Sequence, residues 1–182
     1  TLKGAVEELL SDLGMDKRTV YDPENKKNFL HPGRQANILY DGKTLGYMGE
    51  VHPVVANNYA IKDRVYIAVI DTTVLRNEAS FDKKFEAIAK FPAATRDISM
   101  VVPKAVLAGQ IEEVFDGKGG AYLESYKLFD IYEGNQILSG FKSMAYSLVF
   151  RAKDKNLSDE DVNSAMNRIL KALKSMNIEL RS

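Results

Sequence analysis

Three side chains suited to holding a nucleic-acid base recur in two successive segments with strand-like alternation. Asp130 and Tyr132 lie two residues apart in the first segment, and Ser143 opens a small or polar row in the second, continued by Ala145, Ser147 and Arg151. An aromatic ring stacks on any unpaired base, and carboxylate and hydroxyl groups hydrogen-bond to base edges. The pattern therefore indicates a platform for single-stranded nucleic acid. The plainer alternative is an ordinary exposed tyrosine, because aromatic residues suit strands.

The sequence offers little support for catalysis or metal binding. His31 and His52 each precede a proline, and neither is accompanied by a third metal ligand or an obvious nucleophile. The chain has no cysteine, which excludes disulfides, thiolate chemistry and cysteine-based zinc sites. We therefore expect no catalytic residue and no metal site, and a structural role for both histidines.

Composition and charge restrict how this chain can bind RNA. Its 182 residues include 25 Lys or Arg and 25 Asp or Glu, balanced 13 against 13 in residues 1–90 and 12 against 12 in residues 91–182. Neither half therefore has a net positive charge that would attract RNA, so binding must depend on stacking and on a few local cations. Three cations near the end of the chain are expected to face solvent: Lys171, Lys174 and Arg181.

The second half of the chain has the pattern of a β-α-β-β-α-β domain. The expected strands span 96–102, 122–133, 140–151 and 177–180, and the expected helices span 107–115 and 158–174. Ser158 and Asp161 form a capping box at the start of the second helix. This order is that of a ferredoxin-like fold, in which two helices cover one sheet face.

Alternation within the two long strands assigns side chains to the two faces of the sheet. An apolar row should face the helices: Met144, Tyr146, Leu148 and Phe150. On the preceding strand Phe129 and Ile131 are expected to point into the same core. Because successive residues point to opposite faces, this sends Asp130 and Tyr132 to the open face.

The first half predicts a smaller unit of helices and antiparallel strands. A helix is expected from Leu2 to Leu13, with Gly14 as its stop. Strands over 36–40 and 44–51 flank Asp41-Gly42, the favoured pair for a tight hairpin turn. A short helix over 54–59 and a strand over 65–70 follow. Residues 76–84 show no apolar period, so the chain is divided into domains 1–89 and 90–182.

Five motifs of the second half resemble a known RNA-binding domain. They are FP at 91–92 with RDI at 96–98, LFDIYEG at 128–134, GFKS at 140–143, NLSDEDVN at 156–163 and ELR at 179–181. In this order they resemble the ferredoxin-fold anticodon-binding domain that ends the beta subunit of bacterial phenylalanyl-tRNA synthetase. Three motifs of the first half are similar to the synthetase-like module preceding it: LKG at 2–4, LHPGRQA at 30–36 and GYMGEVHP at 46–53.

The resemblance implies the C-terminal piece of such a beta subunit, with an α+β fold. Residues 1–89 would be a partial, non-catalytic class II synthetase-like antiparallel module, and residues 90–182 a ferredoxin-like βαββαβ domain with one open sheet face. By resemblance, Asp130 and Ser143 would hydrogen-bond anticodon base edges while Tyr132 stacks on a base. The cations expected to add contacts with the RNA are Lys142, Arg151 and Arg96.

The same resemblance implies partners and a place in the cell. The expected partners are the anticodon stem-loop of tRNA(Phe), the upstream beta-subunit domains and the alpha subunit that carries out aminoacylation, in a heterotetramer of two alpha and two beta subunits. This piece would need no cofactor, ATP and magnesium serving the complete enzyme, and it would be cytoplasmic. One alternative is a scaffold that packs against the rest of the synthetase without binding RNA alone. An independent enzyme using His31 or His52 is the least favoured.

Overall fold

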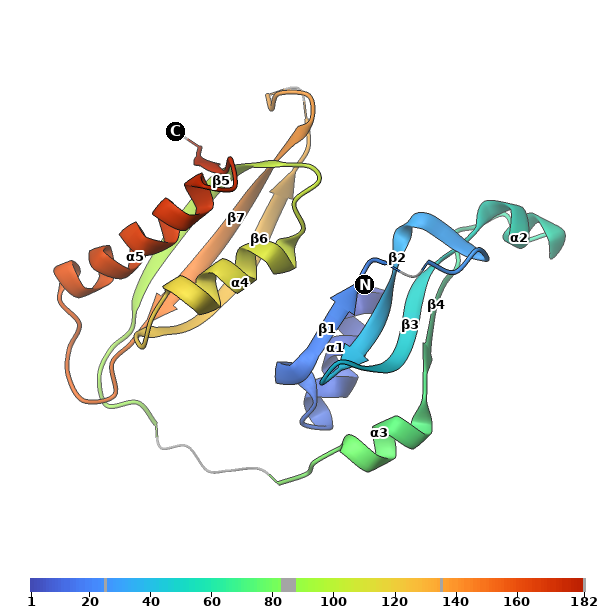
Figure 1. The fold of residues 1–182 in the computed structure, drawn as a ribbon, viewed down its shortest axis with the longest axis horizontal. Coiled ribbons are helices and arrows are strands. Elements are labelled where there is room, and N and C mark those ends of the chain that lie inside the picture. Colours follow the sequence, from blue (N-terminus) through green and yellow to red (C-terminus); the bar gives the residue numbers. More distant parts are fainter. Residues whose placement is uncertain (25, 83–87, 135, 182) are drawn as a thin grey trace. The chain divides into compact units, whose positions relative to one another are not determined.

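The computed structural model describes residues 1–24, 26–82, 88–134 and 136–181. The chain divides into two units, Thr1–Phe85 and Glu86–Ser182, close to the division expected between residues 89 and 90. Each unit has one four-stranded antiparallel sheet accompanied by helices (Figure 1). The expected α+β class with two antiparallel sheets is confirmed.

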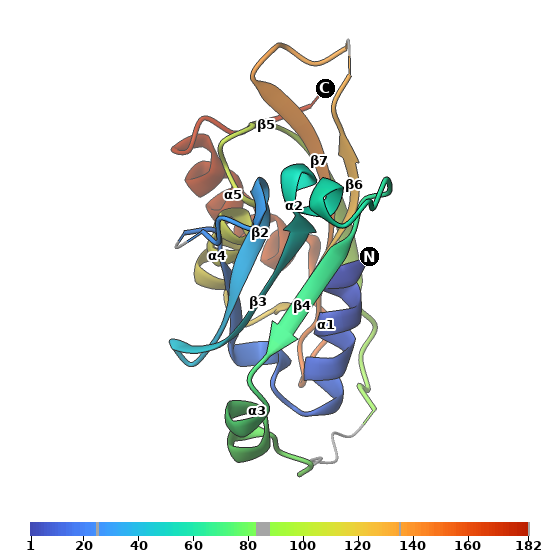
Figure 2. The same ribbon diagram turned by 90° about the vertical axis from the view of Figure 1, so that its right-hand side faces the viewer.

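The first unit packs one long helix against its sheet. Its elements are α1 (Leu2–Asp12), a 3-10 turn (Asp16–Arg18), β1 (Thr19–Asp22), β2 (Leu30–Tyr40), β3 (Lys43–Val51), α2 (Pro53–Asn58), β4 (Tyr66–Ile70) and α3 (Thr72–Glu78). The strands lie in the order β1-β2-β3-β4 (Figure 1), and Figure 2 shows β2, β3 and β4 side by side. Val6 and Leu10 of α1 pack on Ile38 and Leu45 of the sheet. Gly14 follows the helix with φ 68°, a left-handed conformation that favours glycine.

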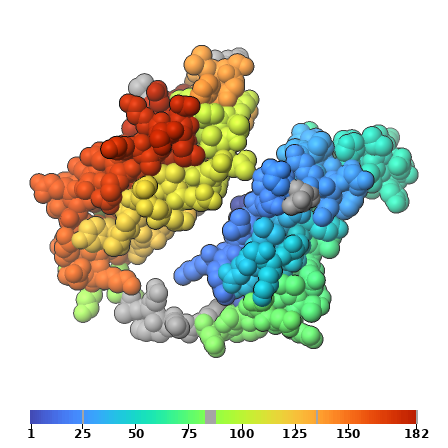
Figure 3. Space-filling model, in the orientation of Figure 1, coloured from blue at the N-terminus to red at the C-terminus, as the bar shows by residue number. Residues whose placement is uncertain are grey.

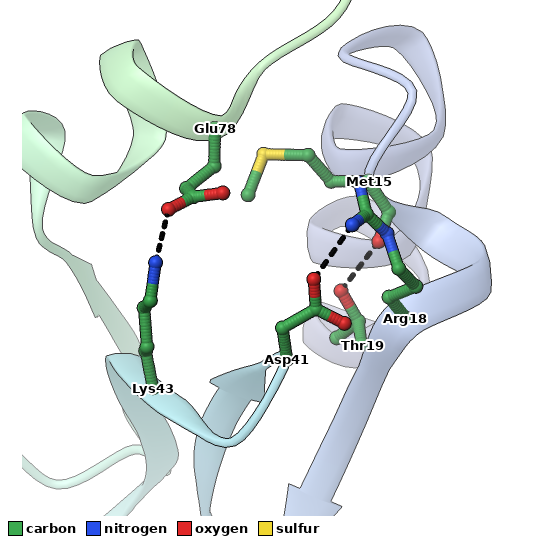
Figure 4. Close-up of polar contacts among 6 residues, drawn as sticks. All are labelled: Met15, Arg18, Thr19, Asp41, Lys43 and Glu78. Atoms are coloured by element: carbon green, nitrogen blue, oxygen red, sulfur yellow. Dashed lines mark hydrogen bonds and ion pairs between the residues drawn. The ribbon is translucent and has the colours of Figure 1, made fainter.

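The hairpin between β2 and β3 turns at Asp41-Gly42, where φ is 48° and 74°. Positive φ at both positions is the requirement of the tight turn that this pair predicts. Arg18 Nη1 lies 2.6 Å from Asp41 Oδ2, and Lys43 Nζ lies 2.5 Å from Oε1 of Glu78 in α3 (Figure 4). These pairs connect the hairpin to the 3-10 turn that precedes β1 and to α3. The sequence pattern predicted none of these three elements.

The second unit has the expected element order. Its elements are β5 (Ala94–Pro103), α4 (Ala108–Lys118), β6 (Leu123–Tyr132), β7 (Phe141–Phe150), α5 (Asp159–Lys174) and β8 (Glu179–Leu180). The strands lie in the order β6-β7-β5-β8, and α4 and α5 lie side by side on one face (Figures 1 and 3).

The core between this sheet and its helices confirms the apolar row predicted on β7. Four alternate β7 side chains are buried among residues of both helices: Met144, Tyr146, Leu148 and Phe150. The capping box is also present, because Ser158 Oγ accepts the N–H of Asp161 at 3.2 Å and Asp161 Oδ2 accepts the N–H of Ser158 at 3.2 Å. Both features predicted for α5, its N-terminal cap and its buried face, are therefore confirmed.

The burial predicted for Phe129 and Ile131 is wrong, although the register keeps Ile131 opposite the core residue Met144, on the predicted side of the sheet. Their exposed fractions are 55% and 53%, and neither belongs to the buried cluster. The pairing of β6 with β7 shifts between Leu128, opposite Tyr146, and Asp130, opposite Ala145. Phe129 is thus the extra residue of a β-bulge, and simple alternation does not continue through such a residue.

Candidate nucleic-acid interface

The register of the second sheet brings three predicted residues onto its uncovered face. Tyr132 of β6 lies opposite Ser143 of β7, and Asp130 lies opposite Ala145. Since Met144 and Tyr146 point into the helix-covered core, Ser143 and its alternates point the other way. We call this side the open face. Its side chains include Lys127, Asp130 and Tyr132 from β6, Ser143, Ala145 and Ser147 from β7, Asp97, Ser99 and Val101 from β5, and Glu179 from β8.

Tyr132 is held against the loop that follows β6. A Cβ atom on Gly134 would lie only 2.2 Å from Tyr132 Oη, so the phenol end of the ring rests where a side chain is missing. The loop is also tied by Glu133, whose Oε2 lies 2.7 Å from Lys104 Nζ, and this hydrogen bond holds the pKa of the Glu133 carboxyl below its usual range. The exposed fraction of Tyr132 is 38%, which leaves area for a stacked base.

Ser143 is present on the open face but almost covered, with an exposed fraction of 3%. Its hydroxyl oxygen lies 3.5 Å from that of Ser99 on β5. A base therefore reaches the Ser143 hydroxyl only after side chains above it move. Asp130, in contrast, is exposed.

Arg181 belongs to this face, although the sequence suggested only a solvent-facing cation. Its backbone N–H donates to Ser99 O at 2.8 Å, which continues the pairing of β8 with β5. Its guanidinium carbon lies 6.0 Å from the centroid of the Tyr132 ring, and Nη2 donates to Gln136 Oε1 at 3.3 Å. Arg181 ends the ELR motif at 179–181, but nothing local places it at this site, because only the pairing of β8 with β5 brings it across the sheet toward Tyr132.

Two of the predicted cations lie on the other face, which the helices cover. Arg96 is opposite Leu148 and Lys142 is opposite Val102, both core positions. Arg96 Nη2 lies 2.8 Å from Oδ1 of Asp159 in the first turn of α5. Lys142 Nζ donates to the carbonyl oxygen of Val106 at 2.8 Å. Neither cation joins Tyr132 on the open face.

Arg151, the third predicted cation, lies just beyond the end of β7 and is partly buried. Its Nε lies 3.0 Å from Glu124 Oε2, and Nη1 donates to the carbonyl oxygen of Phe91 at 3.5 Å. The guanidinium therefore has protein partners in place of a phosphate.

The open face carries charges of both signs. Its exposed acids are Asp97, Asp130 and Glu179, and Lys127 and Arg181 are its exposed cations. Such a surface does not attract the RNA backbone strongly. The arrangement is better suited to reading a base through stacking and hydrogen bonds to its edge.

Both histidines of the first unit support local backbone turns. His31 Nδ1 accepts the N–H of Gly33 at 3.1 Å, and His52 Nδ1 accepts the N–H of Val54 at 3.2 Å at the start of α2. Within the described ranges, no group of three or more His, Asp or Glu side chains could hold a metal ion. No helix in the described part of the chain is long and apolar enough to cross a membrane.

Comparison with known proteins matches both units. A family model described as "Ferredoxin-fold anticodon binding domain" matches residues 89–181, and one described as "Phenylalanyl tRNA synthetase beta chain CLM domain" matches residues 1–72. Among curated proteins, the "Phenylalanine--tRNA ligase beta subunit" of Clostridium acetobutylicum is 42% identical over 99% of this chain and 23% of its own length. The protein of the same name from Symbiobacterium thermophilum is 38% identical over 100% of this chain and 20% of its own length.

A third relative of that name, from Streptococcus pyogenes serotype M1, is 40% identical over 94% of this chain and 21% of its own length. The chain thus spans between 20% and 23% of the length of these relatives. The family model for the second unit alone covers more than half of the chain. The chain therefore belongs to the family of phenylalanine–tRNA ligase beta subunits.

Proposed function

We propose that the second unit binds the anticodon stem-loop of tRNA(Phe) on its open face. The observation that carries this proposal is the grouping of Asp130, Tyr132 and Ser143 on the uncovered face of a domain that belongs to an anticodon-binding family. Tyr132 stacks on an anticodon base. Asp130 accepts a hydrogen bond from a base amino or imino group, because its negative charge disfavours a phosphate. Ser143 bonds a base edge.

Stacking supplies most of the binding energy in this proposal, at about 1 to 3 kcal/mol per base. Arg151, Arg96 and Lys142 contribute to phosphate binding only if they give up the protein oxygens that they now contact. The contribution of these three cations to the binding energy is therefore smaller than the sequence alone predicts. In this proposal the domain recognises the bases of the RNA more than its phosphate charge.

The remaining roles are proposed from the resemblance to the beta-subunit family. We propose that the chain is the part of a phenylalanine–tRNA ligase that binds tRNA, and that it has no catalytic residue of its own. The alpha subunit then performs aminoacylation in a cytoplasmic assembly of two alpha and two beta subunits. ATP and magnesium, in this proposal, are bound by other parts of that enzyme.

A second candidate role, docking of the first unit onto other parts of the synthetase, is favoured by its sheet. Val20 and Val69 are exposed by 60% and 45% on the side opposite α1, where Tyr47 pairs with Val69. Val69→Asp should weaken assembly with separately supplied alpha subunit and upstream beta-subunit domains, with stem-loop affinity unchanged. Unchanged assembly would argue against this face as the docking surface.

A direct titration tests the main proposal. The chain is titrated with the tRNA(Phe) anticodon stem-loop and with hairpins of equal length whose anticodon bases are substituted. Tighter binding of the cognate hairpin is expected, together with no pyrophosphate exchange above background. Equal affinity for all hairpins would leave only non-specific RNA binding and would contradict the proposal.

A further inference from the structure

Tyr132 and Arg181 come from opposite edges of the second sheet and meet above its open face. Tyr132 ends β6, whereas Arg181 follows β8, and β7 and β5 lie between these strands. The Arg181 side chain reaches back over the sheet until its guanidinium lies above the phenol ring. Two planar groups that stack on nucleic-acid bases therefore stand on either side of one small region.

The spacing of these two groups is at the outer limit of a cation–π contact and slightly too narrow for a third plane between them. Stacked planes in nucleic acids are separated by about 3.4 Å, so a base with one plane on each side needs about 7 Å. The guanidinium carbon and the ring centroid are 6.0 Å apart. A displacement of roughly 1 Å would make room for one base.

The restraint on Arg181 is weak enough to allow that displacement. Its contact with Gln136 Oε1, at 3.3 Å, is longer than the usual 2.7 to 3.2 Å range of such bonds. Tyr132, in contrast, is backed by the Gly134 backbone. Of the two groups, the Arg181 guanidinium is thus free to move, whereas the Tyr132 ring is held in place.

Ser143 gives an independent reason to expect opening. It is opposite Tyr132 in the ladder, yet only 3% exposed. If Ser143 is to bond a base edge, the side chains above it must separate. Because Tyr132 is the cross-strand neighbour of Ser143, a base stacked on Tyr132 would lie close to that hydroxyl.

We infer that Tyr132 and Arg181 form the two walls of a slot that takes one unpaired base of an RNA loop. This inference rests on the proposed function and adds Arg181 as a stacking wall. The role depends on the planar shape of the guanidinium, because Arg stacks on a base whereas Lys acts as a point charge. A phosphate contact can also use the planar fork of the guanidinium. Weaker binding by Arg181→Lys therefore supports stacking only together with a change in the fluorescence of a loop base.

The test is a comparison of Arg181→Lys with Arg181→Met in titrations of the anticodon stem-loop at several salt concentrations. Arg181→Lys keeps the charge and is expected to weaken binding by about 3- to 10-fold with the salt dependence unchanged. Lys171→Met, which removes an exposed cation of α5, serves as the charge control and should bind like wild type. If Arg181→Lys binds as wild type while Arg181→Met flattens the salt dependence, Arg181 is a phosphate contact and the slot is wrong.

A spectroscopic signature separates stacking from simple attraction. Stem-loops carrying 2-aminopurine at successive loop positions should show one position whose fluorescence is quenched by the wild-type chain and less so by Arg181→Lys. Equal quenching at saturating protein would overturn the slot. A third outcome is that the wild-type chain binds, Tyr132→Ala weakens binding and Arg181→Lys does not. The slot is then refuted, and the proposed function stands. If the wild-type chain does not bind, or Tyr132→Ala changes nothing, the proposed function fails with it.

Discussion

Replacing Tyr132 with Ala removes the ring on which the proposed base stacks. Loss of one stacked base is worth about 1 to 3 kcal/mol, which corresponds to a Kd raised about 5- to 150-fold. The ring is 38% exposed and lies outside the buried cluster of the unit. Its truncation should therefore cost only about 1 kcal/mol of folding stability, so the loss of binding will not come from unfolding.

The assay is a fluorescence titration of wild type and variant against the cognate stem-loop and an anticodon-substituted one. Phe129→Ala is the matched control, because it removes an exposed aromatic ring from the same strand. Wild-type affinity is expected for the control. Tyr132→Ala should reduce the difference in affinity between the cognate and the substituted hairpin. A Tyr132→Ala chain that binds both hairpins as wild type does would refute the open-face assignment.

Three further outcomes are expected. Ser158→Ala should lower the free energy of unfolding by about 0.5 to 2 kcal/mol, seen as a lower denaturant midpoint at unchanged slope, and a neutral result would mean that α5 does not need this cap. Gly134→Ala should push the Tyr132 ring from its resting place and weaken stem-loop binding while the melting temperature holds; wild-type affinity would show that the ring position is unimportant. Burial, aided by the Asp116 carboxylate, raises the pKa of Tyr126 to about 12. Because the folded-state value lies above the ordinary value near 10, ionisation of this hydroxyl favours the unfolded chain. The free energy of unfolding of wild type should therefore fall relative to that of Tyr126→Phe as the pH rises from about 10 to 12.

The parts of the fold that the sequence predicted are those fixed by local chemistry. The Asp41-Gly42 turn needs positive φ at both residues, and the cap at Ser158 needs a side-chain oxygen before the helix. Phe129 was misplaced because nothing local announces a β-bulge. The shift becomes visible only in the pairing of β6 with β7.

The candidate site was predictable only in part, for a similar reason. Alternation and resemblance both placed Asp130, Tyr132 and Ser143 together, since all three lie on adjacent strands of one hairpin. Arg181 arrives by the pairing of β8 with β5, a contact between distant segments that no spacing rule encodes. Arg96 was named as a contact without regard to its face, and the register opposite Leu148 puts it under α5.

Zero net charge and RNA binding are compatible if bases provide the energy. Phosphate attraction depends on cations that are free to approach the backbone, and Arg96, Lys142 and Arg151 already contact protein oxygens. On the open face, acids stand beside the exposed cations, so an arbitrary polyanion gains little there. A loop that presents an unpaired base gains a stacking surface at Tyr132 and an acceptor at Asp130. If the proposed function is right, the same charge balance that weakens general RNA binding would make this face selective for a loop with splayed bases.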